Sequence, residues 1–147
     1  MEIKYKTVHK AASTPRRMSP GAAGFDLAAC IPEGDLFVDI PPRTTVKIRS
    51  GLAFAIPEGF FGAIYPRSGI SVKRGLRLPN CVGVIDSDYR GEVMLPLYND
   101  SDETQRVYHG DRIAQIIIQA YESCTMTEVK KLSDTERGKG GFGSTGR

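Results

Sequence analysis

Glycine and proline residues interrupt this chain so often that it has little room for long helices. The 147 residues include 16 glycines and 9 prolines, and several apolar runs between them alternate with polar residues. Alternation with a period of two is typical of a strand with one buried face. The pattern therefore predicts an all-β fold, a sandwich or barrel, and speaks against a helical bundle. Ordered β segments are expected at residues 2–8, 25–29, 36–40, 44–48, 52–56, 60–65, 93–97 and 112–121.

The last of these segments is ambiguous in its periodicity. Residues 112–121 also place four apolar side chains at helical spacing. We predict a strand because the segment is β-branched and follows the turn sequence His109-Gly110-Asp111. Only residues 68–74 are expected to form a short helix.

The end of the chain differs in composition from the rest. Residues 133–147 have too little apolar content to fold alone, so we expect a β domain at 1–132 and a flexible Gly-rich arm at 133–147. The net charge of +3 comes entirely from residues 130–147, which leaves residues 1–129 neutral. A neutral body with a weakly basic tail is a poor nucleic-acid surface, but it suits a small polyanion such as a nucleotide triphosphate.

The sequence also indicates a reducing compartment. Cys30, Cys81 and Cys124 are isolated, form no CxxC pair and are odd in number. The N-terminal residues are charged and lack the apolar core of a secretory signal, and no apolar stretch is long enough to span a bilayer. We therefore expect an intracellular protein with no membrane partner, cytoplasmic or, as a second option, nuclear.

The glycine-rich tail is the first candidate for chemistry. Residues 137–147 read RGKGGFGSTGR, in which the glycines at 138, 140 and 143 have the spacing of a dinucleotide-binding fingerprint. That motif must open a helix, and only four residues follow, so the match is spurious. Consecutive glycine N–H groups can converge on phosphate oxygens, Arg137 can clamp a phosphate, and Phe142 offers a face on which a base can stack. The alternative is an inert terminus.

The sequence PRSG at residues 66–69 is a second candidate. If Ser68 begins a helical turn, the amides of that turn point at an anion with Arg67 beside them. The alternative is that Ser68 is an ordinary helix N-cap.

Three further segments combine acidic residues with turn residues. In the segment NCVGVIDSDYRG at residues 80–91, Asp86 could accept a proton from an attacking water, or the segment could be a solvated hairpin. In PGAAGFDL at residues 20–27, Asp26 could help to hold Mg²⁺, or it could be a turn residue. The segment GDRIAQ at residues 110–115 could be a turn and a strand with no further role.

Taken together and in this order, the five segments resemble the trimeric dUTP diphosphatase (dUTPase) family over about residues 20–146. The resemblance implies a jelly-roll-like β fold and a homotrimer with three sites at subunit interfaces, each covered by a neighbour's C-terminal arm. It also implies hydrolysis of dUTP to dUMP and pyrophosphate with Mg²⁺, by water attack on the α-phosphorus. Such a reaction limits uracil incorporation into DNA and supplies dUMP for thymidylate synthesis.

The resemblance assigns a role to individual residues. Asp86 is expected to orient and deprotonate the attacking water, and Gln115 to bind near the α-phosphate and that water. Tyr89 is expected to pack under the deoxyribose where a 2′-hydroxyl would need space, and Asp26 to hold Mg²⁺ through water. The remaining expected substrate contacts are Arg67, Ser68 and Gly69 on phosphates, Asn80, Gly83, Val84 and Ile85 on uracil, and Arg137, Phe142, Gly143, Ser144 and Thr145 in the arm.

Three other functions remain as alternatives. A deoxycytidine triphosphate deaminase shares this fold, but the complete Asp86–Tyr89 segment and the full glycine-rich arm favour the diphosphatase. A non-catalytic nucleotide sensor would not need Asp86 or Arg137. A single-stranded nucleic-acid binder is disfavoured by the neutral body and by only 6 Tyr, 6 Phe and no Trp in the chain.

Overall fold

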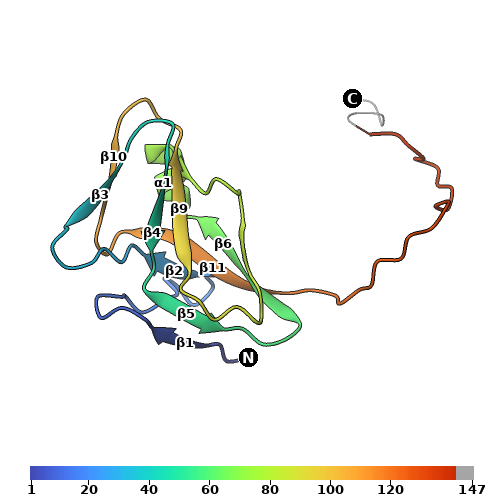
Figure 1. Cartoon of the computed structure of the whole chain (residues 1–147), viewed down its shortest axis with the longest axis horizontal. Helices are drawn as coiled ribbons and strands as arrows, with labels where there is room; N and C mark the ends of the chain where they lie inside the picture. Colours follow the sequence, from blue (N-terminus) through green and yellow to red (C-terminus); the bar gives the residue numbers. More distant parts are fainter. Residues whose placement is uncertain (142–147) are drawn as a thin grey trace.

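The structure, a computed structural model, describes residues 1–141 and is built almost entirely of strands (Figure 1). In chain order its elements are β1 (Lys4–Thr7), β2 (Phe25–Ala28), β3 (Phe37–Ile40), β4 (Thr45–Arg49), β5 (Leu52–Ala55), β6 (Phe60–Pro66), α1 (Ser68–Arg74), β7 (Leu76–Arg77), β8 (Gly83–Ile85), β9 (Met94–Asn99), β10 (Gln105–Tyr108) and β11 (Arg112–Ala120). The expected all-β class with one short helix is confirmed. Strands β7 and β10 were not predicted, and β8 was expected only as part of a possible hairpin at residues 80–91.

The strands form four small antiparallel sheets around one hydrophobic core. The sheets are β1–β5, β3–β10, β4–β9–β7 and β2–β11–β6–β8. They do not close into a barrel within residues 1–141, so the barrel version of the prediction is wrong. Side chains from all four sheets meet in a single cluster that includes Leu27, Ile40, Leu52 and Leu95. Burial of each such side chain contributes about 1.5–3 kcal/mol to folding.

The position of strand β11 explains why its sequence fits both a strand and a helix pattern. It lies between β2 and β6 in the four-stranded sheet, and both of its faces are partly covered. Ala114 and Ile116 point into the core and are at most 1% exposed. Gln115 and Ile117, on the opposite face, are half-buried. A strand packed on two sides has no purely polar face, so its apolar residues also match a helical spacing.

Helix α1 begins directly after strand β6. Arg67 is its N-cap in extended conformation, with φ −76° and ψ 139°, and no side chain caps the helix. Ser68 is therefore the first helical residue, and the alternative of a Ser68 N-cap is wrong. The helix ends at Gly75, whose φ of 63° is the left-handed conformation that glycine adopts without strain.

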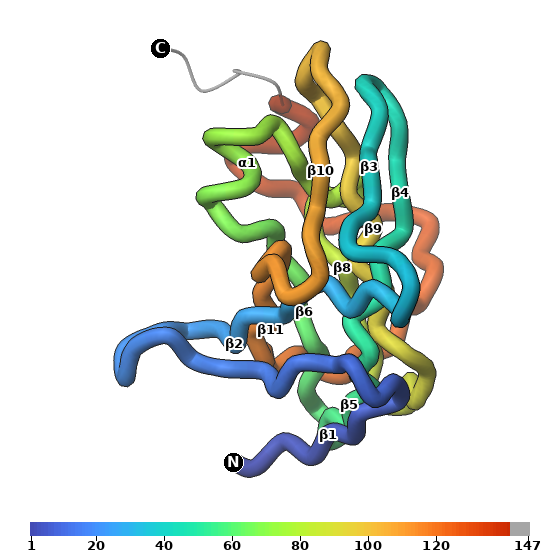
Figure 2. The backbone as a smooth tube through the Cα atoms, turned by 90° about the vertical axis from the view of Figure 1, so that its left-hand side faces the viewer, coloured from blue at the N-terminus to red at the C-terminus, as the bar shows by residue number. Residues whose placement is uncertain are grey.

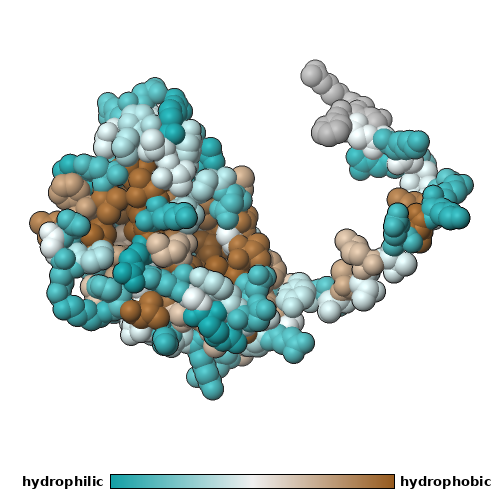
Figure 3. All heavy atoms as spheres, in the orientation of Figure 1, coloured by the Kyte–Doolittle hydropathy of each residue, from teal (hydrophilic) through white to brown (hydrophobic). Residues whose placement is uncertain are grey.

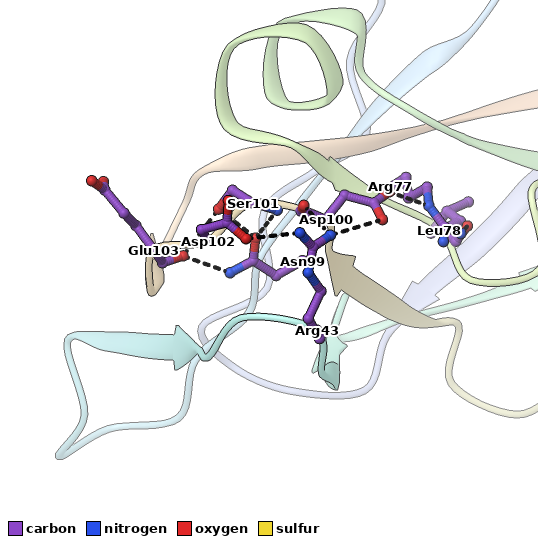
Figure 4. A network of polar contacts seen from close by, with 8 residues as sticks. All are labelled: Arg43, Arg77, Leu78, Asn99, Asp100, Ser101, Asp102 and Glu103. Atoms are coloured by element: carbon purple, nitrogen blue, oxygen red, sulfur yellow. Dashed lines mark hydrogen bonds and ion pairs between the residues drawn. The ribbon is translucent and has the colours of Figure 1, made fainter.

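The end of β9 lies in a network of polar contacts around Asn99 (Figure 4), and a backbone hydrogen bond ties it to the end of α1. The Asn99 side chain is fully buried, and its amide nitrogen donates to the carbonyl oxygens of Ile40 and Glu103, each at 2.8 Å. The neighbouring Asp100 N–H donates to the Gly75 carbonyl at 2.8 Å. Because buried amides are costly to leave unpaired, this network fixes the turn after β9 and, with it, the helix that follows Arg67.

The chain leaves the body after β11. Tyr121 still donates its N–H to the Gly59 carbonyl at 3.1 Å, and its ring lies edge-on to Phe61. Residues 122–141 contain no helix or strand and extend away from the body (Figure 1). Figure 3 shows that this segment is mostly polar, whereas hydrophobic side chains gather over the middle of the body. Within the described part of the chain, no helix has the length and apolarity needed to cross a membrane.

Candidate active site

The four-stranded sheet brings three of the expected site residues to one place. Gln115 on β11 pairs with Asp26 on β2 and with Tyr65 on β6, so the three side chains form one row on the same face of the sheet. Arg67 directly follows β6 and lies beside this row, because its N–H donates to the Ile113 carbonyl on β11 at 3.3 Å. Residues separated by up to 89 positions in the sequence thus meet at one end of the sheet.

A glycine allows the loop before β2 to approach β11. Gly24 is buried, and a Cβ atom there would lie 3.1 Å from the Gln115 Oε1, from the Ile116 carbonyl oxygen and from the Ile117 Cγ1. This is tighter than ordinary van der Waals contact. The glycine in the segment PGAAGFDL therefore holds the loop close to the side chain of Gln115.

Asp26 lies between two arginines. Its Oδ2 is 3.2 Å from the Arg67 Nε and 3.2 Å from the Arg112 Nη1, and its side chain is only 11% exposed. The two arginine side chains are 32% and 43% exposed, so both can reach a ligand. With one carboxylate and two guanidinium groups, the cluster carries a net positive charge and suits an anion. Arg112 was not predicted as a site residue, although it lies within the recognised segment GDRIAQ.

The start of α1 adds backbone donors beside this cluster. Ser68 and Gly69 are both exposed. The first N–H groups of a helix have no acceptor within the helix, so those of Ser68 and Gly69 are available to water or to a ligand, whereas the Ile70 N–H already donates to the Arg67 carbonyl at 3.1 Å. Arg67 contacts Asp26, and Ser68 and Gly69 follow it directly in the chain; that these three residues bind phosphates stays a prediction.

The protein groups near Asp26 fit Mg²⁺ only as part of a complex with substrate. Among the described residues, no three His, Cys, Asp or Glu side chains gather in a metal-binding group. Mg²⁺ commonly keeps several waters and uses one or two carboxylates together with substrate phosphates. A single carboxylate at Asp26 matches that donor set, whereas a resident all-protein site does not form in this part of the chain.

A second group of expected residues lines a pocket beside β8. Asn80, Gly83, Val84 and Ile85 border a cavity of about 260 Å³. Strand β8 pairs with β6 through Gly83 and Ile64, and a Cβ on Gly83 would lie 3.2 Å from the Ile64 Cβ, so glycine allows close packing there. The cavity is completed by Lys47, Ile64, Leu78, Met94 and Pro96. Lys47 at its border was not predicted.

The loop after β8 carries Asp86 and Tyr89. Both side chains are exposed, and the Tyr89 N–H donates to the Asp86 carbonyl at 3.2 Å, which closes a tight turn. The Tyr89 hydroxyl donates to the Glu92 carbonyl at 3.0 Å. The two residues are therefore held by the same short loop, and the carboxylate of Asp86 is open to a water or a substrate.

Glu92 anchors this loop to the turn between β4 and β5. Its carboxylate accepts hydrogen bonds from Arg49 Nε at 3.0 and 3.1 Å, from Arg49 Nη2 at 2.8 Å and from the Gly51 N–H at 2.8 Å. Burial alone would raise the pKa of Glu92, but the bonds from Arg49 and Gly51 together lower it below its ordinary value of 4.5. Sequence reasoning missed Glu92 and Arg49, because their pairing spans 43 residues.

Replacement of Glu92 with Gln should destabilise the protein. We expect the free energy of unfolding at pH 7 to fall by about 1–2 kcal/mol, since charged hydrogen bonds are lost. Because the folded-state pKa of Glu92 is lowered, its stabilising effect is complete above pH 4.5 and disappears as the pH falls through the folded-state pKa. Urea unfolding of both proteins at pH 7 and at pH 3 measures this. The difference should be smaller at pH 3, and the exposed Glu58, replaced with Gln, should show neither effect.

The two groups of site residues do not meet within one chain. Strands β2 and β8 are the opposite edges of the sheet β2–β11–β6–β8 (Figure 2). Three strand spacings separate these edges by about 14 Å. Arg137 lies in the extended segment, where its Nε donates to the Gly140 carbonyl at 2.9 Å. The expected contacts at Phe142, Gly143, Ser144 and Thr145 lie outside the described residues.

Known proteins match this chain over nearly its full length. A family model described as dUTPase matches residues 10–146. A protein of Syntrophotalea carbinolica described as deoxyuridine 5′-triphosphate nucleotidohydrolase is 45% identical, covering 98% of this chain and 96% of its own length. A Finegoldia magna protein with the same description is 43% identical, with coverages of 98% and 99%. The dUTPase of Staphylococcus bacteriophage 80alpha with dUPNHPP has a TM-score of 0.89 at 28% identity, covering 99% of both chains. From these matches and the fold described above, the chain belongs to the dUTPase family.

Proposed function

We propose that this protein hydrolyses dUTP to dUMP and pyrophosphate, with Mg²⁺, in a homotrimer whose active sites are shared between subunits. The observation that carries the proposal is that one sheet has an arginine-rich anion cluster at its β2 edge and a pocket of about 260 Å³ at its β8 edge. The names of the relatives support dUTP as the substrate. The reaction would limit uracil in DNA and supply dUMP for thymidylate synthesis.

The pocket beside β8 is suited to a uracil base. Its walls are mainly apolar, and the Asn80 carboxamide can both donate and accept a hydrogen bond. A hairpin backbone adds further N–H and carbonyl groups of fixed position. Polar partners of this kind can reject a mismatched base by about 10⁴–10⁵-fold, whereas recognition of a single methyl group gives only about 10–200-fold. Exclusion of thymine therefore requires the rigid backbone of residues 80–86 as a steric wall.

Cleavage of a phosphoanhydride requires positioning and charge neutralisation more than covalent help. Asp86 accepts a proton from the attacking water, and Gln115 orients that water near the α-phosphate. Arg67, with the N–H groups of Ser68 and Gly69, binds phosphate oxygens. Asp26 would hold Mg²⁺ through water, and the ion would supply further charge neutralisation at the substrate phosphates.

A second and a third copy of the chain complete the site in this proposal. The anion cluster and the base pocket lie at opposite edges of one sheet, so neighbouring copies can bring complementary edges together. Residues 133–147 act as a flexible arm that closes over a neighbour's site and brings Arg137 and Phe142 to the substrate. Closure would exclude water other than the nucleophile.

The location proposed for the enzyme is intracellular and cytoplasmic. Cys30, Cys81 and Cys124 are free, and burial together with the Glu92 carboxylate raises the pKa of the Cys30 thiol. Neutral, unpaired thiols are typical of a reducing compartment.

The proposed function is tested by a substrate panel. We expect the purified protein to release pyrophosphate from dUTP with Mg²⁺, and much more slowly from dTTP, dCTP and UTP or after chelation of Mg²⁺. Ammonia released from dCTP would instead indicate a deaminase. Tight dUTP binding without pyrophosphate would indicate a nucleotide sensor.

A further inference from the structure

The ring of Tyr89 lies directly against the α-carbon of Gly91. A Cβ atom at Gly91 would lie 2.6 Å from the Tyr89 Cζ and 3.0 Å from its Cε2, and it would overlap the hydroxyl. Real Cβ atoms essentially never approach other atoms this closely. The position of the tyrosine ring therefore depends on the missing side chain of Gly91.

Two hydrogen bonds hold the same tyrosine at its backbone and at its tip. Its N–H donates to the Asp86 carbonyl at 3.2 Å, and its hydroxyl donates to the Glu92 carbonyl at 3.0 Å. The accepting carbonyl of Glu92 is itself fixed, because the Glu92 side chain binds Arg49 and the next N–H, that of Val93, donates to the Leu52 carbonyl at 2.8 Å. With one side on Gly91, the tyrosine is still 43% exposed, so part of it remains accessible to a ligand.

A side chain at position 91 would displace the ring without disturbing the fold. The backbone of Gly91 is not in the left-handed region, so alanine can adopt its conformation. The atoms that a Cβ would meet all belong to the far end of an exposed side chain. The physical consequence is a movement of the Tyr89 ring at little cost to stability.

We propose that Gly91 is a positioning residue for Tyr89 and thereby sets how strongly the site rejects ribonucleotides. The inference rests on the proposed function, in which Tyr89 packs under the deoxyribose at the place that a 2′-hydroxyl would occupy. A ring whose tip lies against Gly91 and whose hydroxyl is hydrogen-bonded to the Glu92 carbonyl forms a rigid wall there. A ring that is displaced leaves room for the hydroxyl or loses its contact with the sugar.

The test compares Gly91→Ala with the wild type and with Gly21→Ala. Gly21 is exposed, its backbone is not left-handed, and nothing lies within 4 Å of a Cβ placed there. For Gly91→Ala we expect the ratio of kcat/KM for dUTP to kcat/KM for UTP to fall at least about tenfold, the scale of steric discrimination in a pocket. The melting temperature should stay within about 2 °C of the wild type. For Gly21→Ala the ratio should not change.

A double-mutant cycle separates positioning from a general structural effect. Tyr89→Ala removes the wall itself, so adding Gly91→Ala to that variant should not change the dUTP/UTP ratio further. An unchanged ratio in Gly91→Ala, or an equal further loss in the Tyr89→Ala background, would overturn the inference while dUTP hydrolysis by the wild type still upheld the proposed function. Absence of dUTP hydrolysis in the wild type would overturn both.

Discussion

Replacement of Asp86 with Asn should lower the turnover of dUTP by about 10²–10⁴-fold, the usual contribution of a general base. Asparagine keeps the size of the side chain and its hydrogen bonding but cannot take a proton from water. Because Asp86 is exposed at the start of the Asp86–Tyr89 turn, we expect the fold and the affinity for a non-hydrolysable dUTP analogue to remain within about threefold of the wild type.

The measurement combines pyrophosphate release, which gives kcat, with calorimetric titration of the analogue. The matched control is Asp88→Asn, because Asp88 is another exposed aspartate in the same loop. Unchanged turnover in Asp86→Asn, or an equal loss in Asp88→Asn, would contradict the assignment of Asp86 as the base.

Truncation of the chain after Asp134 should abolish most catalysis without unfolding the protein. Residues 122–141 contain no helix or strand and leave the body, so the core and the four sheets do not depend on the removed residues. We expect turnover to fall at least about 10²-fold, because charge-stabilising donors and the cover over the site are lost together. The melting temperature should change by no more than a few degrees.

Point substitutions distinguish the loss of turnover that comes from a missing positive charge from the loss that comes from an uncovered site. Arg137→Gln should reproduce a large part of the loss, whereas Lys139→Gln removes the same charge two residues away and should have little effect on kcat. Circular dichroism and pyrophosphate release follow the fold and the activity of each variant. Full activity in the truncated protein would show that the arm has no catalytic role.

Much of the fold was predictable from local patterns. Alternation predicts strands β1, β5 and β9, the turn at Pro41-Pro42 predicts β3 and β4 on either side of it, and α1 is predicted with the bounds that the structure shows. The chain reverses so often at glycine and proline that each segment had to be short.

The missed elements carry too little local signal. Strand β7 has two residues, and in β10 only Val107 is buried while its neighbours are polar or exposed. Their pairing with β9 and β3 depends on residues far away in the sequence. No short stretch of the sequence therefore indicates which strand pairs with β7 or with β10.

The sequence predicts the candidate site as a set of residues but not as an arrangement. The resemblance supplied Asp26, Gln115 and Arg67, and the sheet register brings them together. It gave no reason to expect that Asp26 is paired with Arg112, 86 residues away, or that Glu92 binds Arg49. Such long-range ion pairs follow from the three-dimensional register of the strands, which the sequence pattern alone leaves open.

The contact between Gly91 and Tyr89 has a consequence for how such a protein can evolve. Most substitutions that alter a binding site also reduce stability, and selection removes those that fall below the threshold for folding. Here the atoms in contact belong to an exposed side-chain tip, so a change of sugar selectivity at position 91 would be nearly free of that penalty. Under the proposal, a substitution at position 91 could therefore relax the selectivity for deoxyribose while the protein still folds.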